Sequence, residues 1–264
     1  MIAPAPAKIN LALVVGPLRP DGKHEVTTVL QRIDVVDRIT VEPARETSVE
    51  GFPDTIVRRA LSLLPGAWRV RIEKHVPVAA GLGGGSSDAA TALRLANAQL
   101  DDPLPADELR RRAAAVGADV PFFLCDGPQL GTGDGSQLEP VVLPQDFAVL
   151  LVLPHGAAKA STGDVYRAFD ARAGASGYEA RVEALRAALA VVRRPRDLAG
   201  LPPNDLASSP LAERLLAAGA FRADVTGAGP AVWGLFADAD AAERAQRALR
   251  DAGETRVTTP AWYG

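Results

Sequence analysis

The sequence predicts an α+β fold in which helices and antiparallel strands pack in layers. Segments with the polar and apolar alternation of strands are mixed with segments of helical periodicity along the whole chain. Several alternating segments follow one another like hairpins, which disfavours a doubly wound parallel sheet. The 264 residues are 47% hydrophobic, which is enough to bury one large core or two moderate ones.

The first third of the chain is expected to form strands around one helix. Residues 7–15 are mostly aliphatic and stop at a Gly-Pro pair, which is typical of a buried strand. Residues 33–42 alternate in their second half like an edge strand, and residues 68–74 alternate like a half-exposed strand. Between them, residues 55–64 carry apolar side chains at helical spacing and end at Pro65-Gly66, which predicts a helix and its stop.

The middle of the chain is expected to form two helices, a hairpin and a buried strand. The helices are predicted over residues 86–100 and 105–116. A glycine-rich segment after residue 126 marks a loop or hairpin, and residues 147–153 form an apolar strand. The Pro154-His155-Gly156 break that follows is our candidate boundary between an N-terminal domain, residues 1–153, and a C-terminal domain, residues 154–264.

The C-terminal part is expected to hold three helices and two strands. The helices are predicted over residues 178–192, about 209–218 and about 238–252, with Asp238 as the cap of the last. A strand is predicted over residues 231–236, and another ends the chain.

Composition argues against several classes of function. A net charge of -3 with mixed signs leaves no basic stripe for nucleic acid. The apolar segment 9–15 is too short to span a membrane, and no secretory cleavage pattern follows it. A single cysteine, Cys125, excludes an intramolecular disulfide, and the histidines are scattered without the spacing of a metal site. We therefore expect a cytoplasmic protein with no membrane or nucleic-acid partner.

The stretch from residue 77 to residue 90 is the strongest candidate for a binding site. Four glycines within five positions expose backbone N–H groups, and the Ser-Ser-Asp-Ala-Ala that follows is typical of the first turns of a helix. The helix dipole favours an anion at this end, although the spacing fits neither familiar phosphate-loop pattern. We expect a nucleotide phosphate here, and a helix entry without a ligand is the alternative. The residues expected to bind it are Pro77, Ala79, Gly81, Leu82, Gly83, Gly84, Gly85, Ser86 and Ser87.

Asp119 is a second candidate for a functional residue. It stands between Gly117-Ala118 and Val120-Pro121, ahead of a bulky apolar run, which predicts a position at an element boundary beside the core. By itself this pattern fits a cap or turn acid as well as a functional carboxylate.

Three separated motifs occur in a characteristic order. Ala5-Pro6-Ala7-Lys8-Ile9-Asn10-Leu11 opens the chain, the glycine-rich stretch lies in the middle, and Thr226-Gly227-Ala228-Gly229-Pro230 lies near the end. In this order they resemble the GHMP kinase superfamily, which includes the galactokinase, homoserine, mevalonate and phosphomevalonate kinases. The similarity runs over nearly the whole chain. Asp21-Gly22-x-His24-Glu25 and residues 117–123 resemble one group of members in particular.

The resemblance implies a two-domain α+β protein with its active site in the cleft between the domains. The N-terminal domain would bind ATP with its phosphates on residues 81–87, and the C-terminal domain would stand on the substrate side. The γ-phosphoryl group would pass to the 2-hydroxyl of the methylerythritol part of a cytidine diphosphate conjugate. Lys8 and Asp119 occupy the positions of the family's catalytic pair. Asp119 would accept the hydroxyl proton, and Lys8 would keep it ionised and face the developing charge.

The same resemblance implies substrate contacts from both ends of the chain. His24 stands where the family recognises cytosine, and Tyr166 where an aromatic commonly stacks on the base. A surface histidine and a partly buried helix tyrosine are the alternatives. Lys23 replaces the usual tyrosine, so one face of the expected aromatic sandwich is missing, and Ser136 stands where a glutamate is usual. The other expected contacts are Asn10, Thr226, Gly227 and Ala228, and serines are common at 226 and 228.

Two other functions stay open. One is a kinase of the same superfamily for a mevalonate-, phosphomevalonate- or homoserine-like alcohol, which Lys23 favours. The other is a catalytically silent nucleotide-binding module, against which the presence of both Lys8 and Asp119 speaks. Mg²⁺ is expected with ATP, because phosphoryl transfer needs charge neutralisation between the β- and γ-oxygens, and Ser86 or Ser87 are candidate ligands. The protein is expected to act as a monomer or homodimer.

Overall fold

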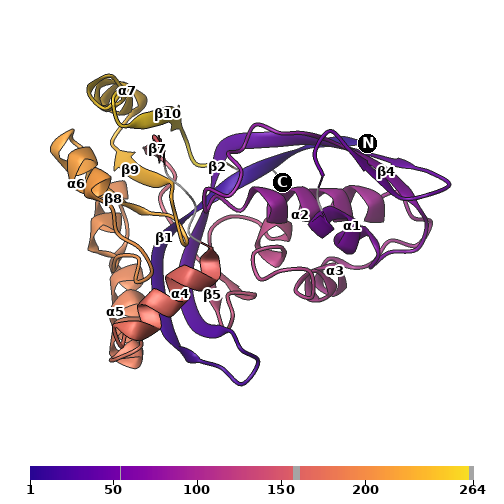
Figure 1. Ribbon diagram of the computed structural model, residues 1–264, viewed down its shortest axis with the longest axis horizontal. Coiled ribbons are helices and arrows are strands. Elements are labelled where there is room, and N and C mark those ends of the chain that lie inside the picture. The colour runs from indigo at the N-terminus through magenta and orange to yellow at the C-terminus, as the bar shows by residue number, and fades with distance from the viewer. Residues whose placement is uncertain (54, 157–160, 262–264) are drawn as a thin grey trace.

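The computed structural model describes residues 1–53, 55–156 and 161–261, which form two sheets with helices packed against them (Figure 1). This arrangement confirms the α+β class. The first sheet has the order β3-β4-β2-β5-β6, with β1 paired to β2 beside this path, and its pairs are antiparallel except β3 with β4. Its strands are β1 (Ile2–Leu18), β2 (His24–Pro43), β3 (Ser48–Glu50), β4 (Trp68–Glu73), β5 (Gln129–Thr132) and β6 (Gln137–Pro140).

The second sheet is antiparallel in all its pairs and has the order β10-β7-β9-β8. It brings one strand from the middle of the chain together with three from the C-terminal part. These strands are β7 (Ala148–Pro154), β8 (Arg222–Val225), β9 (Val232–Phe236) and β10 (Gly253–Thr258).

The helices divide between the two sheets (Figure 1). We call the first sheet with its helices the first lobe; these are α1 (Thr55–Leu61), α2 (Gly84–Asn97), α3 (Ala106–Ala113) and the 3-10 helix η1 (Pro121–Leu124). We call the second sheet with its helices the second lobe; these are α5 (Tyr178–Val191), η2 (Pro195–Gly200), α6 (Pro210–Ala217) and α7 (Ala239–Ala248). Between the lobes, α4 (Thr162–Ala171) packs on β1 and β2.

The long β1 and β2 strands connect the lobes. Ala5 of β1 belongs to the core of the first lobe, whereas Leu11 of the same strand packs with β7, β9 and α5. The register of β1 on β2 shifts between Pro6 and Ala7 and again between Asn10 and Ala12. Register shifts of this kind, like β-bulges, re-aim the side chains beside them. They bracket Lys8 and Asn10, the two polar residues of β1 that matter for the site.

The position and length of β2 differ from the sequence prediction. An edge strand was expected over residues 33–42, but β2 begins at His24 and pairs with both β1 and β4. The prediction was wrong because the first half of β2 carries buried polar side chains, including Thr28, Gln31 and Arg32, which hide the alternation of a strand. The Arg32 guanidinium donates a hydrogen bond to the carbonyl oxygen of Phe122. This bond offsets part of the free-energy cost of burying the charged side chain.

Other predicted elements agree more closely with the structure. β4 alternates between buried and exposed residues as expected, and α5 matches its predicted range within one residue at the C-terminal end. Asp238 caps α7, because its Oδ1 accepts from the N–H of Ala241 at 2.8 Å. α2 begins at Gly84, two residues before the expected start, and α4 was not predicted.

The division of the chain between residues 153 and 154 stays a prediction, and β7, which ends there, pairs with β9 and β10. None of the helices in the described ranges combines the length and apolar character needed to cross a membrane.

Candidate active site

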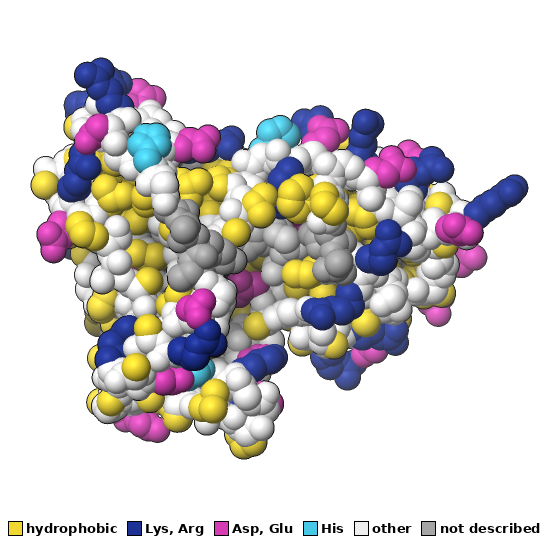
Figure 2. Space-filling model, viewed as in Figure 1, with side chains coloured by type: hydrophobic (Ala, Val, Ile, Leu, Met, Phe, Trp, Pro, Cys, Tyr) yellow, Lys and Arg dark blue, Asp and Glu magenta, His cyan; other side chains and the backbone are white. Residues whose placement is uncertain are grey.

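A cavity of about 680 Å³ opens between the lobes. Residues of the first lobe, such as Phe52 and Lys74, line it together with residues of the second, such as Gly227. The space-filling view shows this face hollowed between the two halves of the molecule (Figure 2). The glycine-rich stretch, Lys8, Asp119 and Tyr166 all border the same cavity, so the structure brings together motifs from the beginning, middle and end of the chain.

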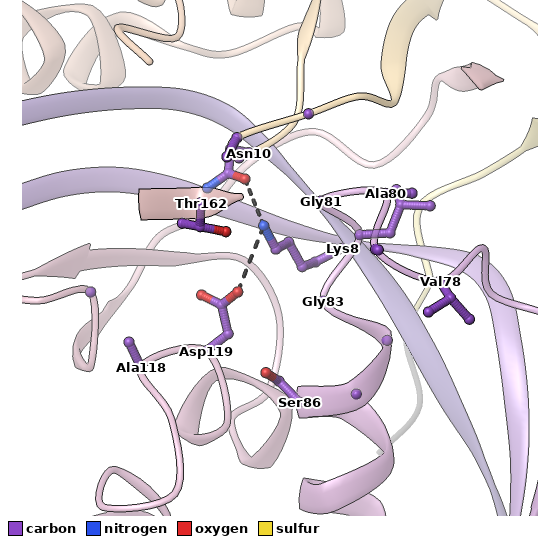
Figure 3. Close-up of a pocket in the computed structure, with 18 of the residues that line it drawn as sticks. Lys8, Asn10, Val78, Ala80, Gly81, Gly83, Ser86, Ala118, Asp119 and Thr162 are labelled. Carbon is purple, nitrogen blue, oxygen red and sulfur yellow. Dashed lines mark hydrogen bonds and ion pairs between the residues drawn. The ribbon is translucent and has the colours of Figure 1, made fainter. Parts of the chain in front are cut away.

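The glycine-rich stretch turns directly into α2 at the cavity wall (Figure 3). Gly83 is the N-cap residue with φ +70°, and no side chain caps the helix. The first amide groups of a helix have no intrahelical acceptor, so here they are available to an anion. Gly81 has φ +83°, and a Cβ there would lie 2.3 Å from the carbonyl oxygen of Thr226. Glycine is required at this position by both the backbone angle and the space.

Lys8 and Asp119 point toward each other at the cavity wall (Figure 3). Lys8 is 4% exposed, and its Nζ lies 3.7 Å from Oδ2 of Asp119. Burial lowers the pKa of Lys8, and the negative charge of Asp119 offsets part of this effect. Asp119 lies two residues before η1 and is itself partly exposed, so its carboxylate can reach a molecule in the cavity.

Asn10 and Thr226 hold the lysine in place. Lys8 Nζ donates to Oδ1 of Asn10 at 2.7 Å, and Nδ2 of Asn10 donates to Thr28 Oγ1 at 2.8 Å. The Thr226 hydroxyl lies within hydrogen-bonding distance of Asn10 Oδ1, at 3.1 Å, and of the Gly81 carbonyl, at 3.2 Å. The three motifs predicted from sequence are therefore joined by one buried hydrogen-bond network.

Tyr166 and Asp134 also line the cavity. Burial, together with the charge of Asp119, raises the pKa of Tyr166 to about 12, so its phenol stays protonated. Asp134 is bound by Lys23, whose Nζ lies 2.5 Å from Oδ2, and by Ser136. Partial burial acts to raise the pKa of Asp134, but these donors outweigh it and lower the value to about 2. Lys23 thus contacts Asp134, and it does not line the cavity.

His24 lies behind Tyr166. The two rings stack with centroids 4.6 Å apart, and His24 is not among the described residues that line the cavity. Ala228 and Gly227 do line it, near Lys8.

Sequence reasoning missed a charged cluster beside the glycine-rich stretch. Lys74 lines the cavity and donates to Asp37 and to Asp88, each at 2.6 Å, and both carboxylates are fully buried. Burial and the neighbouring Asp37 raise the pKa of Asp88 to about 7, although Lys74 opposes the shift. No local pattern could reveal this cluster, because the register of β2 on β4 and the start of α2 bring its members together.

The residues present are compatible with Mg²⁺ carried mainly by ATP phosphates. The described part of the chain holds no group of three or more histidine, cysteine or acidic side chains that could bind a metal. Ser86 borders the cavity, whereas the Ser87 hydroxyl is buried without a hydrogen-bond partner in the described residues. Mg²⁺ usually keeps several waters and takes few protein ligands beside substrate phosphates, so one hydroxyl here suits such an ion.

Comparison with known proteins places these features in a family. Residues 54–127 match the model of the GHMP kinases N terminal domain, and residues 206–255 match that of the GHMP kinases C terminal region. The 4-diphosphocytidyl-2-C-methyl-D-erythritol kinase of Moorella thermoacetica is 38% identical over 97% of both chains. That of Rhodococcus jostii is 37% identical over 97% of this chain and 90% of its own.

Solved structures agree with these similarities. A crystal structure of 4-(cytidine 5'-diphospho)-2C-methyl-D-erythritol kinase superposes with a TM-score of 0.78 at 32% identity and covers both chains completely. A crystal structure of mevalonate kinase superposes with a TM-score of 0.72 at 13% identity, which shows a shared fold alone.

Proposed function

The chain belongs to the GHMP kinase family, and we propose that it phosphorylates the 2-hydroxyl of 4-diphosphocytidyl-2-C-methyl-D-erythritol. It is a kinase that uses ATP and an alcohol acceptor. The observation that carries the proposed substrate is similarity over 97% of the chain to kinases named for it. The reaction would belong to non-mevalonate isoprenoid synthesis, and the single cysteine favours a cytoplasmic setting.

In the proposed mechanism, Asp119 acts as the general base. A tertiary alcohol is a weak nucleophile while it is protonated, so a carboxylate within reach can accept its proton as the new P–O bond forms. The position of Asp119 on the cavity wall, partly open and 3.7 Å from Lys8, supports this role. The bond between the γ-phosphorus and the β–γ bridging oxygen would break as the new bond forms, so that ADP leaves and Asp119 is left as a carboxylic acid beside the new ester oxygen.

Lys8 would hold Asp119 ionised and stabilise negative charge on the transferred group. Its side chain is fixed by Asn10, which is fixed in turn by Thr28, and such pre-organisation lowers the cost of reaching the transition state. ATP would place its phosphates on the amides between residues 81 and 87. Mg²⁺ would neutralise the β- and γ-oxygens, with Ser86 as the candidate protein ligand.

Tyr166 is proposed to stack on the cytosine, and Asn10, Thr226, Gly227 and Ala228 to border the acceptor. A second candidate function, phosphorylation of another small alcohol, is favoured by one observation. Lys23 stands where the family usually has an aromatic residue, and its ammonium is engaged by Asp134. The protein is proposed to act as a monomer or a homodimer.

The proposal is tested by measuring ADP release in the presence of Mg-ATP. The acceptor 4-diphosphocytidyl-2-C-methyl-D-erythritol is compared with mevalonate and homoserine at equal concentration. We expect turnover with the cytidine conjugate alone. Turnover with mevalonate or homoserine instead would support the second candidate, and ATP binding without turnover on any acceptor would contradict both.

A further inference from the structure

The middle of the glycine-rich stretch is held by other parts of the chain. The carbonyl oxygens of residues 80, 81 and 82 each accept a hydrogen bond. Their donors are the N–H of Ala231 at 3.2 Å, the hydroxyl of Thr226 at 3.2 Å and the N–H of Lys8 at 2.9 Å, in that order. The second lobe and β1 therefore fix the backbone of the stretch at its centre.

The two ends of the stretch are held by one carboxylate, that of Asp37 on β2. Its Oδ1 accepts from the N–H groups of His75 and Val76, at 2.5 and 2.8 Å, directly before the stretch. Its Oδ2 accepts from Nζ of Lys74 at 2.6 Å. The same Nζ donates to Oδ2 of Asp88 in α2, also at 2.6 Å. Asp37 is thus joined to the entry of the stretch directly, and to its exit through the ammonium of Lys74.

The entry and the exit also lie against each other at Gly84, the first residue of α2. A Cβ at Gly84 would lie 3.0 Å from Nζ of Lys74 and 3.1 Å from Cγ1 of Val76. A side chain at Gly84 would therefore push the two ends of the stretch apart. A loop whose ends are fixed side by side has fewer conformations to lose when a ligand binds to it.

The charges of this cluster point to a role beyond stability. Asp37 and Asp88 are fully buried, and a buried ion pair is often no more stabilising than apolar residues of the same volume. When both carboxylates are ionised, the cluster carries one net negative charge beside a site for phosphates. That charge by itself disfavours ATP, so the cluster must serve ATP binding in another way if it serves it at all.

We propose that Asp37 and Lys74 are positioning residues that hold the glycine-rich stretch in its phosphate-binding conformation before ATP arrives. In this role they act through the backbone of residues 75–84 and not by contact with ATP. This inference rests on the proposed placement of the ATP phosphates on that stretch. If the binding conformation were populated in only about a tenth of the molecules, the apparent affinity for ATP would fall about tenfold.

Direct contact of Lys74 with a phosphate is the alternative, because Lys74 borders the cavity. The two roles predict opposite effects for Asp37→Asn. The asparagine oxygen can still accept from the N–H groups of His75 and Val76, but its amide nitrogen then faces the ammonium and cannot accept from it. The substitution frees Lys74 and removes a negative charge, so direct contact predicts equal or tighter binding of ATP. A positioning role predicts weaker binding.

The test measures the binding of adenosine and of a magnesium-bound, non-hydrolysable ATP analogue by calorimetry, which needs no turnover. We expect Asp37→Asn and Lys74→Met to bind the analogue about tenfold more weakly and adenosine within about twofold of the wild type, because adenosine has no phosphate. Lys74→Arg keeps a cation that can donate to both carboxylates, and it should restore most of the affinity. Glu42→Gln, at an exposed acid of the same strand, is the matched control.

Unchanged or tighter binding of the analogue by Asp37→Asn would overturn the proposal. So would equal losses for the analogue and adenosine, because the effect would then not concern the phosphates. Leu215→Ala, a core substitution in the second lobe, shows whether a lower thermal midpoint alone weakens nucleotide binding. If Lys74→Met does not fold, the nearly isosteric Asp37→Asn decides.

The wild type tests the proposed phosphate site separately. Equal affinity of the wild type for adenosine and the analogue would remove that site, and the positioning role with it. A wild-type preference for the analogue that Asp37→Asn fully retains would remove the positioning role alone.

Discussion

Replacing Asp119 by asparagine is the most direct test of the proposed chemistry. The amide has nearly the shape of the carboxylate but cannot take a proton from an alcohol. A positioned general base contributes roughly 10²–10⁴-fold to a rate, so we expect kcat to fall by about that factor. ATP should still bind, because its phosphates would be held by backbone amides of the glycine-rich stretch, which the substitution leaves unchanged.

The same substitution removes the charge opposite Lys8. At 3.7 Å the attraction is worth about 1 kcal/mol in water and about 4.5 kcal/mol at an effective dielectric constant near 20. Asp119 is 38% exposed, so the lower part of this range applies. Because burial already lowers the pKa of Lys8, loss of the acid lowers it further. Residual activity of Asp119→Asn should therefore decline at a lower pH than the activity of the wild type.

The assay is steady-state ADP release at saturating Mg-ATP, run from pH 6 to pH 10 in about half-unit steps. Binding of a non-hydrolysable ATP analogue is measured in parallel. Asp126→Asn, an exposed acid just beyond η1, is the control and should keep wild-type kinetics. Activity of Asp119→Asn within about tenfold of the wild type would refute the role of Asp119 as base.

Three further predictions concern the loop, the base pocket and the buried acids. Gly81→Ala should lower the free energy of unfolding by about 3 kcal/mol or more, because its Cβ would lie 2.3 Å from the Thr226 carbonyl oxygen. Gly219→Ala, with positive φ but open space, should cost about 1–2 kcal/mol in the same denaturant titration, and equal losses would contradict the steric argument. Lys23→Tyr should lower the KM for the cytidine conjugate about fivefold or more, whereas Lys23→Met should not, and an unchanged KM in the tyrosine variant would argue against a base near residue 23. The pKa of Asp88 is about 7 in the folded protein and 3.8 in the reference state, so the folded form binds more protons between these values. Stability should therefore fall as the pH rises from about 4 to about 7, and thermal midpoints of Asp88→Asn should lack this decline; parallel curves for the two proteins would show that Asp88 is not its source.

The central part of the site could be predicted from sequence because it depends on local patterns. The glycine-rich stretch needs positive φ angles and close backbone contacts, and only glycine meets both requirements at residue 81. Lys8 and Asp119 stand within short motifs whose order along the chain is itself informative. Both side chains line the same cavity, and their catalytic roles remain proposals.

Other parts of the site depend on pairing over long distances in the chain. Lys74, Asp37 and Asp88 meet only because β2 pairs with β4 and α2 begins beside them. The first half of β2 could not be recognised as a strand because it carries polar side chains at buried positions. Those of Thr28 and Gln31 are satisfied there by hydrogen bonds. Similarly, the stack of His24 on Tyr166 depends on the docking of α4, which no periodic pattern predicts.

The register shifts between β1 and β2 have a consequence for changes in chain length. In a strand, successive side chains point to opposite faces, so a shift by one residue exchanges the faces of everything that follows. The register shifts on either side of Lys8 and Asn10 set which face these two side chains take. Deleting Ala7 would put Ile9 into the register of Lys8, and so bring an aliphatic side chain to the place of the ammonium. An exchange of one small apolar residue for another along this segment leaves the register intact, whereas a change of length ahead of Lys8 does not.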